Sequence, residues 1–307
     1  MSSNRLDKYV AEKFPQFSRS QSQKLIETGK ILVNGKCSKS SYVCKDSDEV
    51  HLVTTKKSAN KKSKFEKSLV DFPVLYEDAE CIVINKRAGV SVYPINEADK
   101  SITIVDFSLQ RFKAKFKDPE RPGIVHRLDK ETSGVLILAK NQKALEYLMA
   151  EFKNREVKKV YLALVYGTLQ HLEGIIDSPI ARSHKHRKKM SLAAEGTGRQ
   201  AISQYKVLKE FRVDPKHMVS LLQIRIHTGR THQIRVHMSS IGHPVIGDVT
   251  YGNPSMNRMF IKKFGLRRQF LHASLVEFKT PVNDKQVSVL AELPDELKNL
   301  ETRLQLI

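Results

Sequence analysis

Four polar side chains stand directly before an apolar segment in the middle of the sequence. They are His126, Arg127, Asp129 and Lys130, and the apolar segment covers residues 135–139. We expect a buried strand at 135–139, preceded by a loop held against it, and such loops often carry functional residues. Nearby cations favour the ionised form of Asp129. A fixed, ionised carboxylate can act as a nucleophile or as a base, so Asp129 is the first candidate for chemistry.

A second polar segment, residues 227–237, contains Arg235 and three histidines, which are His227, His232 and His237. We expect Thr231 to cap a helix that carries Arg235 and stops at Gly242. The histidine spacings do not place all three on one helical face, and no cysteine or carboxylate is near, so we expect no metal site. The guanidinium of Arg235 can hold a carboxylate in bidentate geometry and fix its direction.

Tyr161 lies in an alternating segment, residues 160–166, that indicates a strand. Most strand tyrosines are packing residues. A phenol near a carboxylate can instead transfer a proton or stack on a base.

The charge balance indicates a polyanionic partner. Lysine and arginine number 53 against 33 acidic residues, which gives a net charge of +20. This excess favours a nucleic acid over a merely solvated surface. No segment has the length and apolarity of a membrane span, so we expect no membrane partner.

Three cysteines, Cys37, Cys44 and Cys81, form no Cys-x-x-Cys pair, and residues 1–10 lack the apolar segment of a signal peptide. We therefore expect a reduced, cytoplasmic setting. The absence of a glycine-rich phosphate loop predicts no nucleotide cofactor.

Residues 1–55 are typical of a small module. Ser18 or Ser20 can cap a helix that ends at Gly29, followed by a strand at 31–33, an Asn34-Gly35 turn and a later strand at 50–53. Its basic side chains predict contact with RNA; they are Arg19, Lys24, Lys30 and Lys36. Residues 56–70 are rich in lysine with little to bury, which predicts a basic, flexible linker.

Residues 71–307 carry many strand signals and few helices. Strands are expected at 81–84, 222–226, 270–278 and 287–293. The strands do not alternate regularly with helices, so we expect a mixed α+β domain with a mainly antiparallel sheet. One helical stripe is expected to face the core; it consists of Leu145, Leu148, Met149 and Phe152.

Residues 126–134, which read His-Arg-Leu-Asp and, two residues later, Thr-Ser-Gly, resemble the signature of the RluA-type pseudouridine synthases. The resemblance continues through ordered segments at 75–94, 160–163, 227–252 and 271–281. Residues 5–52 resemble an S4 RNA-binding domain, a small αL-like module. The resemblance covers nearly the whole chain.

The resemblance implies an isomerase that breaks the N1 glycosidic bond of a uridine in RNA and rejoins the base through C5. It implies Asp129 as the catalytic carboxylate, Arg235 as its partner and Tyr161 as the active-site tyrosine. Arg127 would fill the space that a flipped uridine leaves. His126, Arg230 and His232 are further candidates for RNA contact. No metal or cofactor is implied, and attack at C1′, addition at C6 and removal of a 2′ proton remain open.

The S4-like module favours a structured substrate, and we expect large-subunit ribosomal RNA, with transfer RNA as the alternative. A non-catalytic RNA-binding or ribosome-assembly protein is a second alternative. A hydrolase that uses Asp129 as a base is disfavoured because no second acid is placed. We expect a monomer. Arg87 and Tyr93 depart from the proline and histidine common in the family, which bears on the choice of RNA.

Overall fold

The computed structural model describes residues 5–52, 71–94, 96, 99–183, 189–194 and 196–306. The chain divides into two compact units, residues 1–66 and 67–307. Each has its own hydrophobic core. The expected linker at 56–70 lies outside the described residues.

The N-terminal unit contains α1 (Leu6–Lys13), α2 (Arg19–Glu27), β1 (Ile31–Val33) and β2 (Val50–Leu52). Ser18 begins α2 with a capping box, because its hydroxyl accepts from the backbone N–H of Gln21 and the Gln21 side chain accepts in return. Asn34 and Gly35 both have positive φ, 49° and 76°, as a tight two-residue turn requires. That turn closes a single bridge, between Val33 and Lys36, and β1 pairs with β2 instead.

The larger unit is built on a nine-stranded sheet in the order β3-β4-β5-β12-β6-β11-β10-β7, with β13 paired to β12. The strands are β3 (Val74–Glu77), β4 (Cys81–Lys86), β5 (Ser133–Ala139), β6 (Lys158–Tyr166), β7 (Glu173–Asp177), β10 (Ile202–Asp214), β11 (His217–Ile226), β12 (Leu271–Lys279) and β13 (Gln286–Leu290). Among these described strands β5 and β12 are the one parallel pair. The predicted mixed, mainly antiparallel fold is confirmed.

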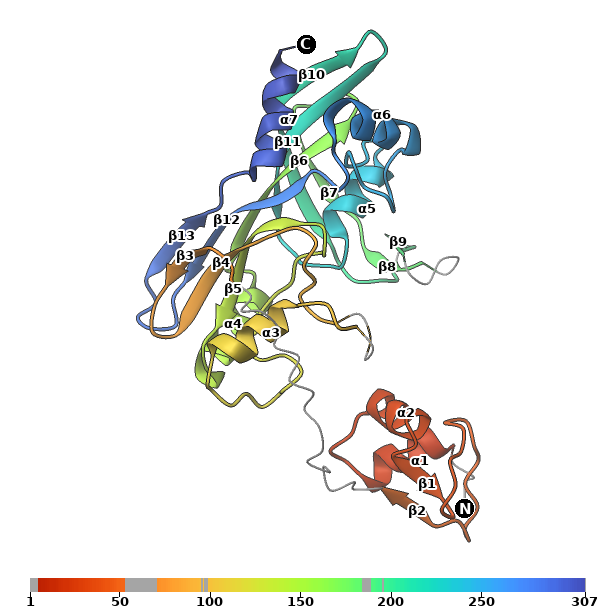
Figure 1. The fold of residues 1–307 in the computed structure, drawn as a ribbon. Coiled ribbons are helices and arrows are strands. Elements are labelled where there is room, and N and C mark those ends of the chain that lie inside the picture. Colours follow the sequence, from red (N-terminus) through yellow and green to blue (C-terminus); the bar gives the residue numbers. More distant parts are fainter. Residues whose placement is uncertain are drawn as a thin grey trace. The chain divides into compact units, whose positions relative to one another are not determined.

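Five helices of the described residues flank this sheet (Figure 1). They are α3 (Ile104–Arg111), α4 (Gln142–Asn154), α5 (Gln233–Ser240), α6 (Pro254–Phe264) and α7 (Asp295–Gln305). α4 packs on β5, and α5 packs on β10 and on β9 (Met190–Leu192), which pairs with β8 (Ile180–Arg182). No helix in the described part of the chain is long and apolar enough to cross a membrane.

β12 lies between β5, which follows the loop with Asp129, and β6, which carries Tyr161. Ala273 lies beside Gly134 of β5 and beside Tyr161 of β6. Gly134 has a φ of 116°, and a Cβ there would lie 2.1 Å from the carbonyl oxygen of Ala273. Only glycine permits this approach. The loop that precedes β5 is thereby held next to β6.

Candidate active site

A cavity of about 490 Å³ brings the three predicted catalytic residues together. Asp129, Tyr161 and Arg235 all line it, although they come from a loop, a strand and a helix far apart in sequence. Asp129 is the one carboxylate among its described lining residues. No group of three or more metal-binding side chains occurs in the described part of the chain.

Arg235 connects Asp129 to a second, fully buried carboxylate. Its Nη1 donates to Asp129 Oδ2 at 2.9 Å, while Nε and Nη2 donate to the two oxygens of Asp248 at 2.7 and 2.9 Å. The bidentate contact that the sequence suggested therefore exists, but toward Asp248, with a single bond to Asp129. Burial opposes the charge of Arg235, but the hydrogen bonds and charges of both acids outweigh it and raise the pKa of Arg235.

Asp248 is the functional neighbour that sequence reasoning missed. Burial favours its neutral form, but Arg235 and the backbone N–H groups of Thr250 and Tyr251 lower the pKa of Asp248. Asp248 is therefore an ionised anchor that fixes the guanidinium from behind. In the sequence, the pattern that could have indicated this role is an acid in a turn, Gly247-Asp248, shortly after the helix that carries Arg235.

The helix that carries Arg235 begins differently from the prediction. Thr231 is exposed, and His232 is the N-cap in a left-handed conformation (φ 58°) without a side-chain cap. The Gln233 side chain holds the segment before the helix instead, because its oxygen accepts from the Thr228 hydroxyl and from the backbone N–H of Arg230. The expected Thr231 cap is therefore wrong, because Thr231 lies before the N-cap residue and α5 has no side-chain cap.

Tyr161 presents a largely buried phenol to the cavity. Its hydroxyl has no hydrogen-bond partner among the described residues and is available to a ligand. Burial, assisted by the negative charge of Asp129, raises the pKa of Tyr161. The phenol thus stays protonated near neutral pH, where it can donate a hydrogen bond or offer a stacking face but does not act as a base.

The Asp129 loop, residues 124–132, is anchored at two residues that follow the aspartate, Lys130 and Thr132. Lys86 is fully buried and its Nζ donates to the carbonyl of Lys130 at 3.1 Å and to two carbonyls of the 87–90 turn. Two residues farther along the chain, the Thr132 hydroxyl accepts from the side-chain amide of Gln269. No role was assigned to Lys86 from the sequence. Its position at the end of an apolar strand could have indicated that it is buried.

His126 and His232 line the cavity as neutral side chains. His126 Nε2 accepts from the backbone N–H of Ile137 at 2.9 Å and its ring stacks on Phe152. Burial, assisted by Lys159, lowers the pKa of His126 to about 3. His126 therefore supports the Asp129 loop and offers no positive charge to RNA. Burial also lowers the pKa of His232, whose Nδ1 bonds the Tyr251 hydroxyl at 2.8 Å.

Arg127 remains available to a ligand. Its side chain is exposed, lines the cavity and forms no hydrogen bond or ion pair with another described residue. The guanidinium carbon lies 5.7 Å from the ring centre of Tyr93, a cation–π contact. Tyr93, where the family commonly has histidine, is thus a neighbour of Arg127.

The remaining predicted RNA contacts fall in two places. Arg230 lines the same cavity. In the N-terminal unit Lys24, Lys30 and Lys36 are exposed, whereas Arg19 is paired with buried Asp7 at 3.1 Å. The predicted core-facing stripe of α4 is wrong at Met149, which is 52% exposed and lines the cavity. Leu145 and Leu148 of the same stripe are buried.

The fold and this site define an enzyme that acts on RNA. The model of the RNA pseudouridylate synthase family matches residues 80–240, and the S4 domain matches residues 4–50. The chain therefore belongs to the RNA pseudouridylate synthase family and is a pseudouridine synthase. The predicted resemblance to the RluA type with an S4 domain is confirmed.

Proteins named as pseudouridine synthases are similar to this chain over most of its length. An uncharacterized RNA pseudouridine synthase of Chlorobaculum parvum is 36% identical over 96% of this chain and 92% of its own length. The ribosomal large subunit pseudouridine synthase D of Vibrio cholerae is 35% identical over 98% of this chain and 91% of its own. The solved structure of human RNA pseudouridylate synthase domain containing 1 is 27% identical, with a TM-score of 0.58 over 78% of this chain and 97% of its own.

Proposed function

We propose that this enzyme isomerises uridines in large-subunit ribosomal RNA, with Asp129 as the catalytic carboxylate acting on a flipped-out nucleotide. One observation carries the proposal: the single carboxylate among the described residues of the cavity wall is held by Arg235, which Asp248 fixes from behind. An ionised acid with a fixed direction is what attack on a sugar carbon, addition to the base or removal of a 2′ proton each require.

Flipping follows from the position of the carboxylate inside a cavity. A uridine stacked in RNA cannot reach it, and extruding the nucleotide costs a few kcal/mol. The unpaired guanidinium of Arg127 at the cavity wall offsets this cost by occupying the space that the base leaves. The Tyr161 ring and its free hydroxyl then hold the base while the N1 bond to C1′ breaks and the C5 bond to C1′ forms.

The reaction removes one proton and adds one. C5 loses a proton when it bonds to C1′, and Asp129 accepts this proton and releases it to solvent. N1 takes up a proton from solvent, while Tyr161, protonated near neutral pH, donates hydrogen bonds to the base.

Two features support ribosomal RNA as the substrate. The S4 domain adds an RNA-binding surface separate from the cavity. In addition, several similar proteins bear the name ribosomal large subunit pseudouridine synthase D. Transfer RNA is the competing substrate, and a non-catalytic assembly role is the competing function.

Pseudouridine mapping tests both parts of the proposal. Ribosomal and transfer RNA are compared from cells that lack the gene and from the same cells carrying wild type or Asp129→Asn. We expect a large-subunit site to disappear, to return with wild type and to stay absent with the isosteric asparagine. Loss confined to transfer RNA refutes the ribosomal target, and rescue by Asp129→Asn refutes the catalytic carboxylate.

A further inference from the structure

Three arginines gather in the wall of the Asp129 cavity: Arg155, Arg199 and Arg230. One residue holds two of them. Arg155 Nη2 donates to the side-chain oxygen of Gln200 at 2.8 Å, and Arg230 Nε donates to the backbone carbonyl of Gln200 at 2.9 Å. Burial lowers the pKa of Arg230, and the nearby charges of Arg199 and Arg155 lower it further. Arg230 is thus close enough to both Arg155 and Arg199 for their charges to repel its own.

The described residues supply no acidic partner for this cluster. None of the three arginines forms an ion pair with an acid among the described residues. The one carboxylate of the cavity wall, Asp129, is bound by Arg235 instead. Clustered like charges are unfavourable unless a ligand compensates them, so the arrangement indicates a site for an anion.

The backbone of Arg155 provides an independent argument. This residue is the C-cap of α4 with a φ of 66° and a ψ of 24°, the left-handed conformation. Glycine is usual at such a position, and any other residue there costs about 1–2 kcal/mol. The cap itself needs only the backbone N–H, which donates to the carbonyls of Glu151 and Phe152. An arginine at a position that favours glycine points to a function of its side chain.

We propose that Arg155, Arg199 and Arg230 form a binding site for a phosphodiester group of the substrate RNA next to the flipped uridine. The inference rests on the proposed function, because it takes the strand to enter the cavity that holds Asp129. Guanidinium groups match the geometry of phosphate oxygens. A phosphate contact fixes the position of the strand without reading its sequence. The site therefore sets which nucleotide of the strand stands opposite Asp129.

The test removes the side chain and keeps the cap. Arg155→Gly should bind an unmodified large-subunit ribosomal RNA transcript about tenfold more weakly, because one charge-assisted contact is lost. The plot of log affinity against log salt should become less steep by about 1. Thermal unfolding should occur at the same or a higher temperature, because the left-handed strain disappears. Arg155→Lys, which keeps the charge, should retain most of the salt dependence.

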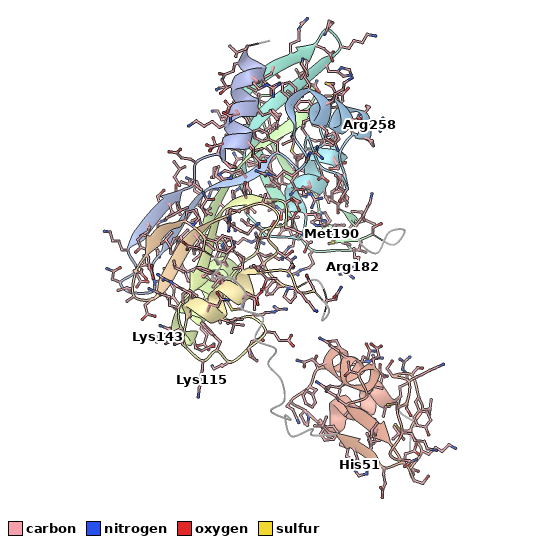
Figure 2. The ribbon with its side chains drawn as sticks, viewed as in Figure 1. His51, Lys115, Lys143, Arg182, Met190 and Arg258 are labelled. Carbon is pink, nitrogen blue, oxygen red and sulfur yellow. The ribbon has the colours of Figure 1, made fainter. Side chains whose placement is uncertain are left out.

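Lys143→Ala is the matched control, because Lys143 is an exposed cation in the first turn of the same helix (Figure 2). It should bind RNA like wild type. Arg155→Gly should raise the RNA concentration that gives the half-maximal rate, whereas Asp129→Asn should bind RNA like wild type and form no pseudouridine. Affinity and salt dependence of Arg155→Gly equal to those of Lys143→Ala overturn the proposal, and so does a lower unfolding temperature. If the wild-type enzyme modifies only transfer RNA, the ribosomal target is refuted but the phosphodiester site is not. Arg155→Gly and Lys143→Ala are then compared on transfer RNA.

Discussion

Replacing Arg235 with leucine tests the arrangement around Asp129 most directly. The change removes the cation that Asp129 and Asp248 share. We expect turnover to fall about 100-fold, because a catalytic group misplaced by about 1 Å loses that much. RNA affinity should change little, since Arg235 is buried and its donors face the two carboxylates.

The same substitution has a calculable effect on stability. Asp248 is 1% exposed and would remain as a buried charge without its partner. Breaking a buried ion pair from one side costs about 3–5 kcal/mol, which lowers the unfolding temperature of a unit of this size by about 6–20 °C. Adding Asp248→Asn removes the orphaned charge and keeps an acceptor for the N–H groups of Thr250 and Tyr251. The double variant should therefore regain most of the lost unfolding temperature.

The measurements are thermal unfolding by circular dichroism and tritium release from RNA labelled at uridine C5. The expected pattern is stability regained by the double variant with turnover still low. Recovery of turnover in the double variant would show that Asp129 does not need Arg235 for its orientation. An unchanged unfolding temperature in the single variant would contradict the role of Arg235 as the partner of Asp248.

Three further predictions concern other parts of the chain. Burial lowers the pKa of Lys86 to about 7 from an ordinary 10.5. Between these pH values the unfolded chain binds a proton that the folded chain does not, so the unfolding free energy should rise by about 1.4 kcal/mol per pH unit. Urea unfolding of wild type and Lys86→Met at several pH values measures this rise. The same slope of unfolding free energy against pH in both proteins would contradict the prediction. His126→Phe should lower the unfolding free energy by about 1–3 kcal/mol, because the Ile137 N–H loses its acceptor. The salt dependence of RNA binding should not change. A weaker salt dependence in this variant would mean that His126 carries a positive charge to RNA. Deletion of residues 1–55 should weaken RNA binding and raise the RNA concentration for half-maximal rate while the larger unit stays folded, and failure to fold would place the boundary elsewhere.

Local patterns in the sequence predicted most elements but not their partners. The strands at β4, β6 and β11 follow from apolar runs and alternation, which are properties of the chain itself. The start of α5 was missed because its N-cap residue, His232, has a left-handed backbone and makes no side-chain cap, so no capping pattern in the sequence marks it. Met149 fits a core stripe by period, yet faces the cavity because no element covers that turn of α4.

The site was predicted to the extent that motif residues carry it. Asp129, Tyr161 and Arg235 were identified from the resemblance, and the structure places them around one cavity. Asp248 and Lys86 were not identified, because their importance depends on what they contact after folding. A buried carboxylate or ammonium has the same local sequence as an exposed one, and only the folded chain shows the difference.

The place of β12 in the sheet affects when the enzyme can work during its own synthesis. The strand lies between β5 and β6 but is encoded 132 residues after the end of β5 (271 − 139). The core of the N-terminal unit, in contrast, is complete by Val50. Domains fold in order as the ribosome releases them, and distant strand pairings form late. A growing chain therefore folds its RNA-binding module before β12 has been made, so a chain that stops before β12 would bind RNA without modifying it.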